Sequence, residues 1–175
     1  MTKVRAILAL LAALLGGAVL VAPSAQAATV TTTLRAGISG LPVATEVRTG
    51  YSRDKFTLWT DADGDGCNTR YEVLIAEAWD SGARTWTAAQ RTAYANDLGD
   101  NRALVAVTDN VNQAKGDKDP AEWMPSYSGA TCRYVAEWLA VKLRWRLTVN
   151  TAERNALTSL AAGCTNISIT VTRAL

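Results

Sequence analysis

The chain has 175 residues, of which 49% are hydrophobic and 19% are charged, and this length permits a single domain of ordinary size. Its six Trp, five Tyr and one Phe supply enough large apolar surface to exclude a disordered chain. The sequence contains no histidine, which excludes the usual Ser-His, Cys-His and His-metal mechanisms because each of them needs an imidazole.

The first residues have the pattern of a secretory signal peptide. Lys3 and Arg5 precede an apolar run over residues 6–22, and residues 25–27 form a small-residue cleavage signature. We therefore predict cleavage after Ala27 and a secreted protein. A membrane anchor is the alternative, but the apolar run contains two glycines and is short for a bilayer span, so we expect no stable membrane association.

Removal of the predicted leader changes the charge of the protein. Residues 1–27 contain two basic residues and no acidic ones, so the mature chain keeps 16 Lys and Arg against 16 Asp and Glu. The mature protein is then formally neutral. Overall charge therefore gives no support to nucleic-acid binding, and only a local basic cluster could provide it.

Local signals predict the first elements of the mature chain. The Thr-rich residues 28–33 are expected to be frayed, and residues 41–47 offer one short helical or extended piece without a firm period. Thr87 and Gln90 have the spacing of a capping box, which predicts a helix that runs to about Leu98.

Residues 103–108 form an apolar, β-branched run between polar residues, which predicts a short buried strand. Asp119 followed by a proline predicts the start of a short helix over residues 119–122. From residue 131 to residue 147, apolar side chains recur with helical spacing and predict a long helix with one broad apolar face.

The end of the chain carries two further signals. Asn150 and Glu153 are placed to cap a helix that ends at Gly163, and residues 167–171 alternate as a terminal strand. The elements together predict fold class α+β in one small, mostly helical domain that extends from residue 28 to residue 175.

The mature chain has three cysteines, Cys67, Cys132 and Cys164. Cys132 opens the long helix and Cys164 closes the next one, so an antiparallel helix pair would bring them together, and a disulfide is expected outside the cell. Cys67 is then left over. It is either a buried or loop thiol, or a cysteine whose partner has been lost from this sequence.

An acidic segment matches the template of a calcium-binding loop over residues 61–72. Asp61, Asp63 and Asp65 occupy positions one, three and five, Gly66 occupies position six, and Glu72 occupies position twelve. Oxygen ligands at this spacing can wrap one Ca²⁺, and the residues that follow are a plausible outgoing helix. A solvated acidic turn is the alternative. A calcium site here would be structural, with an affinity of about 10⁻⁴ to 10⁻³ M.

Five sequence blocks together resemble the HNH nucleases, specifically small exported bacterial HNH proteins whose domain is similar to the nuclease domain that ends some modification-dependent restriction enzymes. The blocks extend through most of the mature chain. They are GYSRDKF at 50–56, DADGDGCNTR at 61–70, EAWDSGA at 77–83, DNRALVAVTDNVNQAKGDKDPAEW at 100–123 and CRYVAEW at 132–138.

The resemblance implies a ββα-metal motif that cleaves DNA with Mg²⁺ or Mn²⁺. It assigns Asn101 to the asparagine that ties the two strands of the motif, Asn112 to the metal and Lys115 to a position near the phosphate. Asp117 and Asp119 would buttress the turn. Without the resemblance, turn and helix-cap chemistry would account for these asparagines and this lysine.

The same resemblance implies that the catalytic first strand is missing. Relatives carry an aspartate that binds the metal and a base histidine shortly before the segment that matches residues 76–79, but here residues 72–75 run directly into that segment. Several dozen residues are absent, and the stretch in relatives also supplies a cysteine, which would explain the unpaired Cys67. Glu77 and Asp80 lie near this junction between residues 75 and 76, but an exposed carboxylate with a pKa near 4 is a poor general base.

Two functions follow as expectations. The first is an HNH-family endonuclease, monomeric and catalytically impaired, with weak or absent DNA binding. The second is a non-catalytic extracellular calcium-binding protein that retains nucleic-acid contact through Arg102, Lys115 and Lys118. An incomplete ββα unit would also leave an unpaired strand edge at residues 104–107 and lower the stability.

Overall fold

The computed structural model describes residues 27–56, 72–103, 105 and 108–174. Several predictions fall outside these residues: the leader up to residue 26, the acidic loop with Cys67 and the side chain of Glu72, and residues 104, 106 and 107 of the predicted strand and its edge. They stay predictions.

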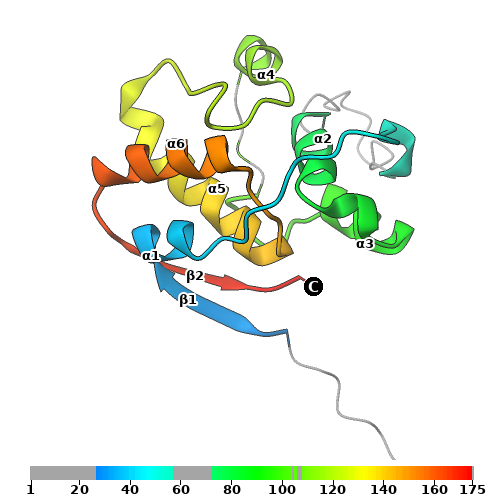
Figure 1. The fold of residues 1–175 in the computed structure, drawn as a ribbon, viewed down its shortest axis with the longest axis horizontal. Helices are drawn as coiled ribbons and strands as arrows, with labels where there is room; N and C mark the ends of the chain where they lie inside the picture. Colours follow the sequence, from blue (N-terminus) through cyan, green and yellow to red (C-terminus); the bar gives the residue numbers. More distant parts are fainter. Residues whose placement is uncertain (1–26, 57–71, 104, 106–107, 175) are drawn as a thin grey trace, which may run out of the picture.

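The described residues form a small, mostly helical domain with one two-stranded antiparallel sheet (Figure 1). The elements are β1 (Thr29–Thr33), α1 (Leu34–Ser39), the 3₁₀ turn η1 (Arg53–Lys55), α2 (Glu72–Asp80), η3 (Ala83–Thr85), α3 (Ala88–Ala95), α4 (Asp109–Lys115), η4 (Ser128–Ala130), α5 (Thr131–Trp145), α6 (Thr151–Ala162) and β2 (Ser168–Thr172).

The sheet joins the two ends of the domain. β1 pairs with β2 from Thr29 opposite Thr172 to Thr33 opposite Ser168, so the predicted terminal strand is confirmed. The prediction of a frayed segment at 28–33 is wrong. Thr side chains have a high preference for strands, and β2, which follows 135 residues later in the chain, provides the hydrogen-bonding partner that no local signal could show.

Caps predicted from the sequence define two of the helices. Both capping boxes are present, with the Thr87 hydroxyl accepting from Gln90 N at the start of α3 and the Asn150 side chain accepting from Glu153 N at the start of α6. α3 ends at Ala95 instead of Leu98, because the Asn96 side-chain amide donates to the helix carbonyl of Thr92 and closes the last turn.

The short helix predicted at 119–122 is a single turn. Glu122 N and Trp123 N both donate to the carbonyl of Asp119, and the Asp119 carboxylate accepts from Ala121 N, so the aspartate does cap the turn. These are the last helical hydrogen bonds before Pro125, which has no backbone N–H to donate.

Two groups of buried side chains form the interior. The first lies between α1, α5, α6 and the sheet, and includes Leu34, Leu139 and Leu157, each at most 1% exposed. The second is rich in aromatic side chains and joins α2 and α3 to the end of α5 through contacts such as Tyr94 against Trp145, whose ring centroids are 5.1 Å apart. The polar residues described next lie on the side of α5 that faces α2 and the residues after α4.

Candidate functional site

A buried lysine on α5 lies at the centre of the polar side chains of the domain. Lys142 is 2% exposed, and its Nζ donates to Glu77 Oε1 at 2.6 Å, to Ser81 Oγ at 2.6 Å and to the carbonyl of Thr148 at 2.8 Å. All three ammonium hydrogens therefore have acceptors. Burial opposes the charged form, but Glu77 and then Glu153 more than offset it and raise the pKa of Lys142 above its ordinary value.

Glu153 is the second carboxylate beside this ammonium group. It is fully buried, its Oε1 lies 3.0 Å from Lys142 Nζ, and the same oxygen accepts a 2.6 Å hydrogen bond from Trp138 Nε1. Burial raises the pKa of Glu153 to about 7, with Lys142 acting in the opposite direction and Glu77 adding to the rise. Glu153 therefore combines a capping role in α6 with a buried charge of high energetic cost.

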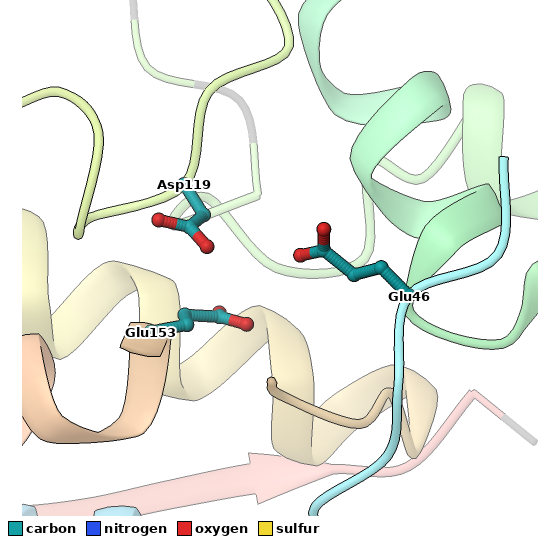
Figure 2. Close-up of side chains that lie close together, drawn as sticks. All are labelled: Glu46, Asp119 and Glu153. Carbon is teal, nitrogen blue, oxygen red and sulfur yellow. The ribbon is translucent and has the colours of Figure 1, made fainter. Parts of the chain in front are cut away.

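Three carboxylates from separate segments, one of them Glu153, converge (Figure 2). Glu46, Asp119 and Glu153 each place an oxygen within 4.8 Å of the others, and Asn150 Nδ2 donates to Glu46 at 2.6 Å and to Asp119 at 2.9 Å. Burial first, and then the neighbouring carboxylates, raise the pKa of Glu46.

Carboxylate oxygens are suitable ligands for a hard divalent cation. In this cluster, however, Lys142 and Asn150 already supply the positive charge and the donors that hold the carboxylates together. None of the three is a residue to which the nuclease resemblance assigns the metal. The close approach of the three carboxylates is therefore explained by the protein's own donors, Lys142 and Asn150.

A second ion-paired group ties the N-terminal segment to α2 and to the residues after α4. Arg48 Nε donates to the Asp80 carboxylate at 2.8 Å, and Arg48 Nη1 donates to Asp117 at 2.6 Å. Burial opposes the charge, but the hydrogen bonds to these two carboxylates raise the pKa of Arg48 overall. The expectation that Glu77 and Asp80 are exposed is wrong, since each is 4% exposed and each is paired with a cation.

Lys115 is the last residue of α4, and its ammonium group lies 4.9 Å from the ring centroid of Trp138. Lys115 Nζ donates to the carbonyl of Lys118 at 2.9 Å. The ammonium of Lys142 lies 5.4 Å from the centroid of the same indole. Burial lowers the pKa of Lys115 to about 8, although Glu77, Asp117 and Asp119 act in the opposite direction.

The other residues to which the resemblance gave roles lie in two regions. Asn112 is part of α4, where its backbone carbonyl accepts from Gly116 N. Asn101 is exposed in the turn that follows α3, and its neighbour Arg102 pairs with Asp100 and donates to the carbonyl of Thr170 in β2. α4 and the sheet lie on opposite sides of α5 (Figure 1), so the region near Lys115 and the turn that Arg102 ties to β2 are separate.

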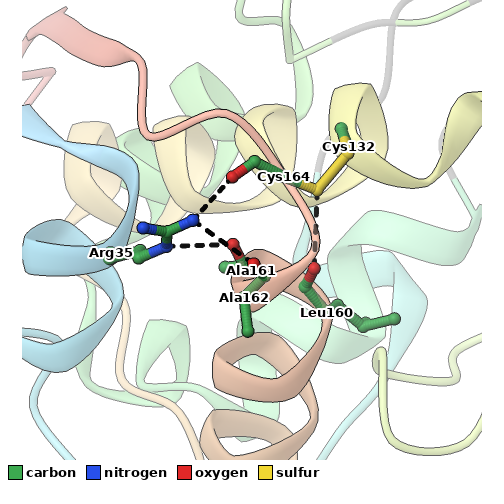
Figure 3. Close-up of a disulfide and its surroundings, with 6 residues drawn as sticks. All are labelled: Arg35, Cys132, Leu160, Ala161, Ala162 and Cys164. Atoms are coloured by element: carbon green, nitrogen blue, oxygen red, sulfur yellow. Dashed lines mark hydrogen bonds between the residues drawn. A yellow bond between two sulfur atoms is a disulfide. The ribbon is translucent and has the colours of Figure 1, made fainter.

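The predicted disulfide between Cys132 and Cys164 is confirmed (Figure 3). It joins the start of α5 to the residues just after α6, with a Cα separation of 5.6 Å, as expected for an antiparallel helix pair. Arg35 of α1 donates to the carbonyls of Ala161 and Cys164 at 3.2 and 2.8 Å, so it caps the end of α6 beside the disulfide.

The sequence did not predict the roles of four charged residues in this polar region, which are the exposed Glu46 and Arg48 and the buried Lys142 and Glu153. Only Lys142 had a usable signal. It follows Trp138 by four positions, so it falls within the apolar face of α5, and a lysine in that position must find a buried anion.

The fold and its polar centre define a small, disulfide-bonded α+β domain. Residues 75–160 match the family model of the C-terminal domain of GmrSD restriction endonucleases. A relative from Arthroderma benhamiae, described as an uncharacterized secreted protein, is 37% identical over 170 residues, which cover 73% of this chain and 82% of the relative. The chain belongs to this GmrSD C-terminal domain family. No solved structure gives a significant match.

Two details of these matches bear on the chain. The alignment with the fungal relative has 170 positions, but 73% of 175 residues is about 128 residues, so about 42 positions of the relative have no counterpart here. The family match begins at Ile75, beside the junction at which the resemblance predicts missing residues. Within the part of the chain that the structure describes, no helix has the length and hydrophobicity needed to cross a bilayer.

Proposed function

We propose that this protein is an exported member of the nuclease family that keeps the domain scaffold and weak DNA contact but does not hydrolyse phosphodiester bonds. The observation that carries the proposal is the absence of histidine from the entire sequence. Hydrolysis needs a base that makes water nucleophilic, and the loss of such a base costs about 10² to 10⁴ in rate.

The buried carboxylates beside the junction, Glu77 and Asp80, do not replace the missing general base. Glu77 accepts from Lys142 and from Ser81, and Asp80 accepts from Arg48, so both carboxylates are occupied by donors. Both are also shielded from solvent, at 4% exposure. A general base must reach the attacking water within hydrogen-bond distance, which neither group can do in this arrangement.

The comparison with the fungal relative supports the loss of an internal stretch. About 42 unmatched positions agree in size with the several dozen residues that the resemblance places before residue 76. The same loss explains why Cys67 has no expected partner. We therefore interpret the chain as an incomplete ββα-metal unit in which α4 persists and residues 103–108 correspond to the second strand, without the strand that carries the catalytic aspartate and histidine.

The metal of the family, Mg²⁺ or Mn²⁺, would have Asn112 as its remaining ligand. Mg²⁺ is normally held by one or two carboxylates in octahedral geometry, so a single neutral amide is an insufficient donor set. We therefore expect no tight binding of Mg²⁺ at α4. DNA contact would rest on Lys115 and Lys118, because the third candidate, Arg102, is engaged by Asp100 and β2.

A plasmid-nicking assay tests the proposal. The mature chain, incubated with supercoiled DNA and Mg²⁺ or Mn²⁺, should produce no nicked or linear product, while gel shifts at low salt detect weak binding that disappears as salt rises. Asn112→Ala is the control variant. Metal-dependent nicking by the natural chain that is lost in Asn112→Ala would overturn the proposal.

Export is the second part of the proposal. The disulfide between Cys132 and Cys164 is of the kind that persists in oxidising compartments, and the fungal relative is described as secreted. The leader pattern places the processing site after Ala27. N-terminal sequencing of the protein from the culture medium should read from Ala28, and a product that retains Met1 would contradict this part.

A calcium-binding function is the second candidate, and the full twelve-position match from Asp61 to Glu72 favours it. Millimolar Ca²⁺ should raise the melting temperature, because a ligand that binds only the folded state stabilises it. Asp63→Asn and Asp65→Asn should remove the shift. If the melting temperature of the natural chain does not change when the Ca²⁺ concentration is 10-fold above the expected dissociation constant of about 10⁻³ M, the calcium site is excluded.

A further inference from the structure

The segment between α6 and β2 carries a sequence pattern that the family function does not use. Asn166, Ile167 and Ser168 form the triplet Asn-x-Ser without a proline in the middle, which is the acceptor pattern for N-linked glycosylation. The sequence has eight asparagines, and Asn166 alone is followed two positions later by Ser or Thr. A pattern this short also arises by chance, so its meaning depends on where the fold places the three side chains.

The fold places the whole triplet at the surface. Asn166, Ile167 and Ser168 are all exposed, and Ile167 is 46% exposed. Ile167 N donates to the carbonyl of Thr165 at 2.9 Å, which closes a tight turn centred on Asn166. The asparagine therefore lies in an exposed turn between two ordered elements, and a bulky group attached there would extend into solvent.

The orientation of the Asn166 amide leaves its nitrogen available. Oδ1 accepts a 2.9 Å hydrogen bond from Arg35 N, a backbone donor in the first turn of α1 that has no acceptor within the helix. Oxygen and nitrogen lie on opposite sides of a planar amide, so this bond turns Nδ2 away from Arg35 N. Nδ2 has no hydrogen-bond acceptor among the residues that the structure describes.

Capping of α1 is the simpler explanation of an asparagine at this position. The two roles do not compete, because glycosylation replaces one hydrogen of Nδ2 and leaves Oδ1 free to accept from Arg35 N. The cap does not account for Ser168, whose hydroxyl is the other member that the triplet requires. Ser168 begins β2 on the exposed face of the sheet, opposite Thr33, and its hydroxyl forms no hydrogen bond with the described residues.

We infer that Asn166 is an acceptor for N-linked glycosylation and that the co-substrate is a lipid-linked oligosaccharide, in which a polyprenyl diphosphate carries the glycan at C1 of its first sugar. The inference rests on the export part of the proposed function, because the transfer takes place on chains that are being exported. A hydrophilic glycan at Asn166 would also shield Ile167, a large apolar side chain that the fold leaves in solvent.

The transfer is chemically balanced. Nδ2 of Asn166 attacks C1 of the first sugar, and a C–N bond forms. The bond between C1 and the diphosphate oxygen breaks, so the polyprenyl diphosphate leaves with the bonding electrons. One Nδ2 proton passes to a base of the transferase, and no atom is oxidised or reduced.

Secretion from yeast tests this inference. The full chain with its own leader is expressed, and the protein in the medium is compared by electrophoresis before and after treatment with a peptide N-glycosidase. We expect the treatment to increase the mobility and to convert Asn166 into aspartate, which peptide mass spectrometry locates. This measurement uses the natural chain, so a folding defect of a variant cannot produce the result.

Variants in β2 separate the triplet from the cap. Ser168→Ala breaks the triplet but leaves the Asn166 amide and its bond to Arg35, so it should be exported without the glycan. Ser168→Thr restores the pattern and should carry the glycan. Thr172→Ala is the matched control, because it removes an exposed hydroxyl from the same face of the same strand outside the triplet, and it should remain glycosylated.

The outcomes are distinguishable from failure of the proposed function. Exported protein that begins at Ala28 and carries an unmodified Asn166 would overturn the inference and leave the proposed function standing. A glycan that persists in Ser168→Ala, or that maps to another residue, would also overturn it. If the chain stays in the cell with Met1 in place, the export part of the proposed function fails, and the inference fails with it.

Discussion

The buried ammonium of Lys142 allows a quantitative test of the polar centre. Lys142→Met keeps the length and much of the volume of the side chain but leaves Glu77 and Glu153 without their cation. Both carboxylates are at most 4% exposed, so water cannot replace the lost partner. Removal of one partner from a buried ion pair costs about 3 to 5 kcal/mol, which for a domain of this size corresponds to a fall in melting temperature of roughly 6 to 20 °C.

The loss should depend on pH in a defined direction. The pKa of Glu153 is raised from 4.5 to about 7, so the folded state binds more protons than the unfolded state between these values, and the associated stability is lost as pH rises through 7. Lys142 opposes the rise in the pKa of Glu153, so without Lys142 this carboxylate has a stronger preference for the protonated form. The destabilisation of Lys142→Met should therefore be largest above pH 7 and smaller at pH 5.

Urea denaturation at pH 5 and pH 8 measures both quantities. Arg133→Met, which removes an exposed ion pair with Glu137 from the same helix, is the control and should change the unfolding free energy by less than about 1 kcal/mol. The triple variant Glu77→Gln/Lys142→Met/Glu153→Gln removes all three charges and should recover much of the loss. A Lys142→Met protein as stable as the natural chain at both pH values would refute the reasoning.

Three further changes have expected outcomes. Replacement of Cys132 and Cys164 by Ala opens a loop of 32 residues and should lower the unfolding free energy in urea by about 4 kcal/mol. Gly37→Ala places a Cβ 2.7 Å from Leu139 Cδ2, so the melting temperature should fall by an amount equivalent to about 1 to 3 kcal/mol, and an unchanged value would show that Leu139 moves freely. Glu153→Gln keeps the capping box but cannot titrate, so it should flatten the change in stability between pH 5 and pH 7, and an unaltered pH profile would assign that change to another group.

Local signals were sufficient for three of the helices but not for α1, and they were insufficient for the pairing between distant segments. The two capping boxes and the apolar spacing of α5 predicted three helices, and the order of those helices predicted the disulfide, because each signal spans only a few residues. β1 was missed because its pairing partner is at the other end of the chain. Residue type alone could not distinguish a frayed Thr-rich tail from an edge strand.

The buried charges show the same limit more sharply. Glu77 is a favourable surface residue in any helix, and nothing in its neighbourhood along the sequence indicates that Lys142, 65 positions later, will desolvate it. The prediction of an exposed carboxylate was therefore the default for an isolated segment, and it was wrong. A lysine in the apolar face of a predicted helix is the one local feature that indicates a buried anion elsewhere in the fold.

The position of the polar centre explains how a domain of this family can keep its fold without the predicted catalytic strand. Arg48, which precedes the junction near residue 75, pairs with Asp80 of α2, and Asn150 at the start of α6 donates to Glu46, so these polar contacts connect the segments on both sides of the proposed loss. Among the residues whose side chains the structure describes, the interior around α1, α5, α6 and the sheet contains none from that junction, and Cys164 of the disulfide belongs to this interior. The side chains that hold these described segments together are thus different from the aspartate and histidine to which the resemblance assigns hydrolysis, so the proposed loss of the strand that carries that pair would leave them in place.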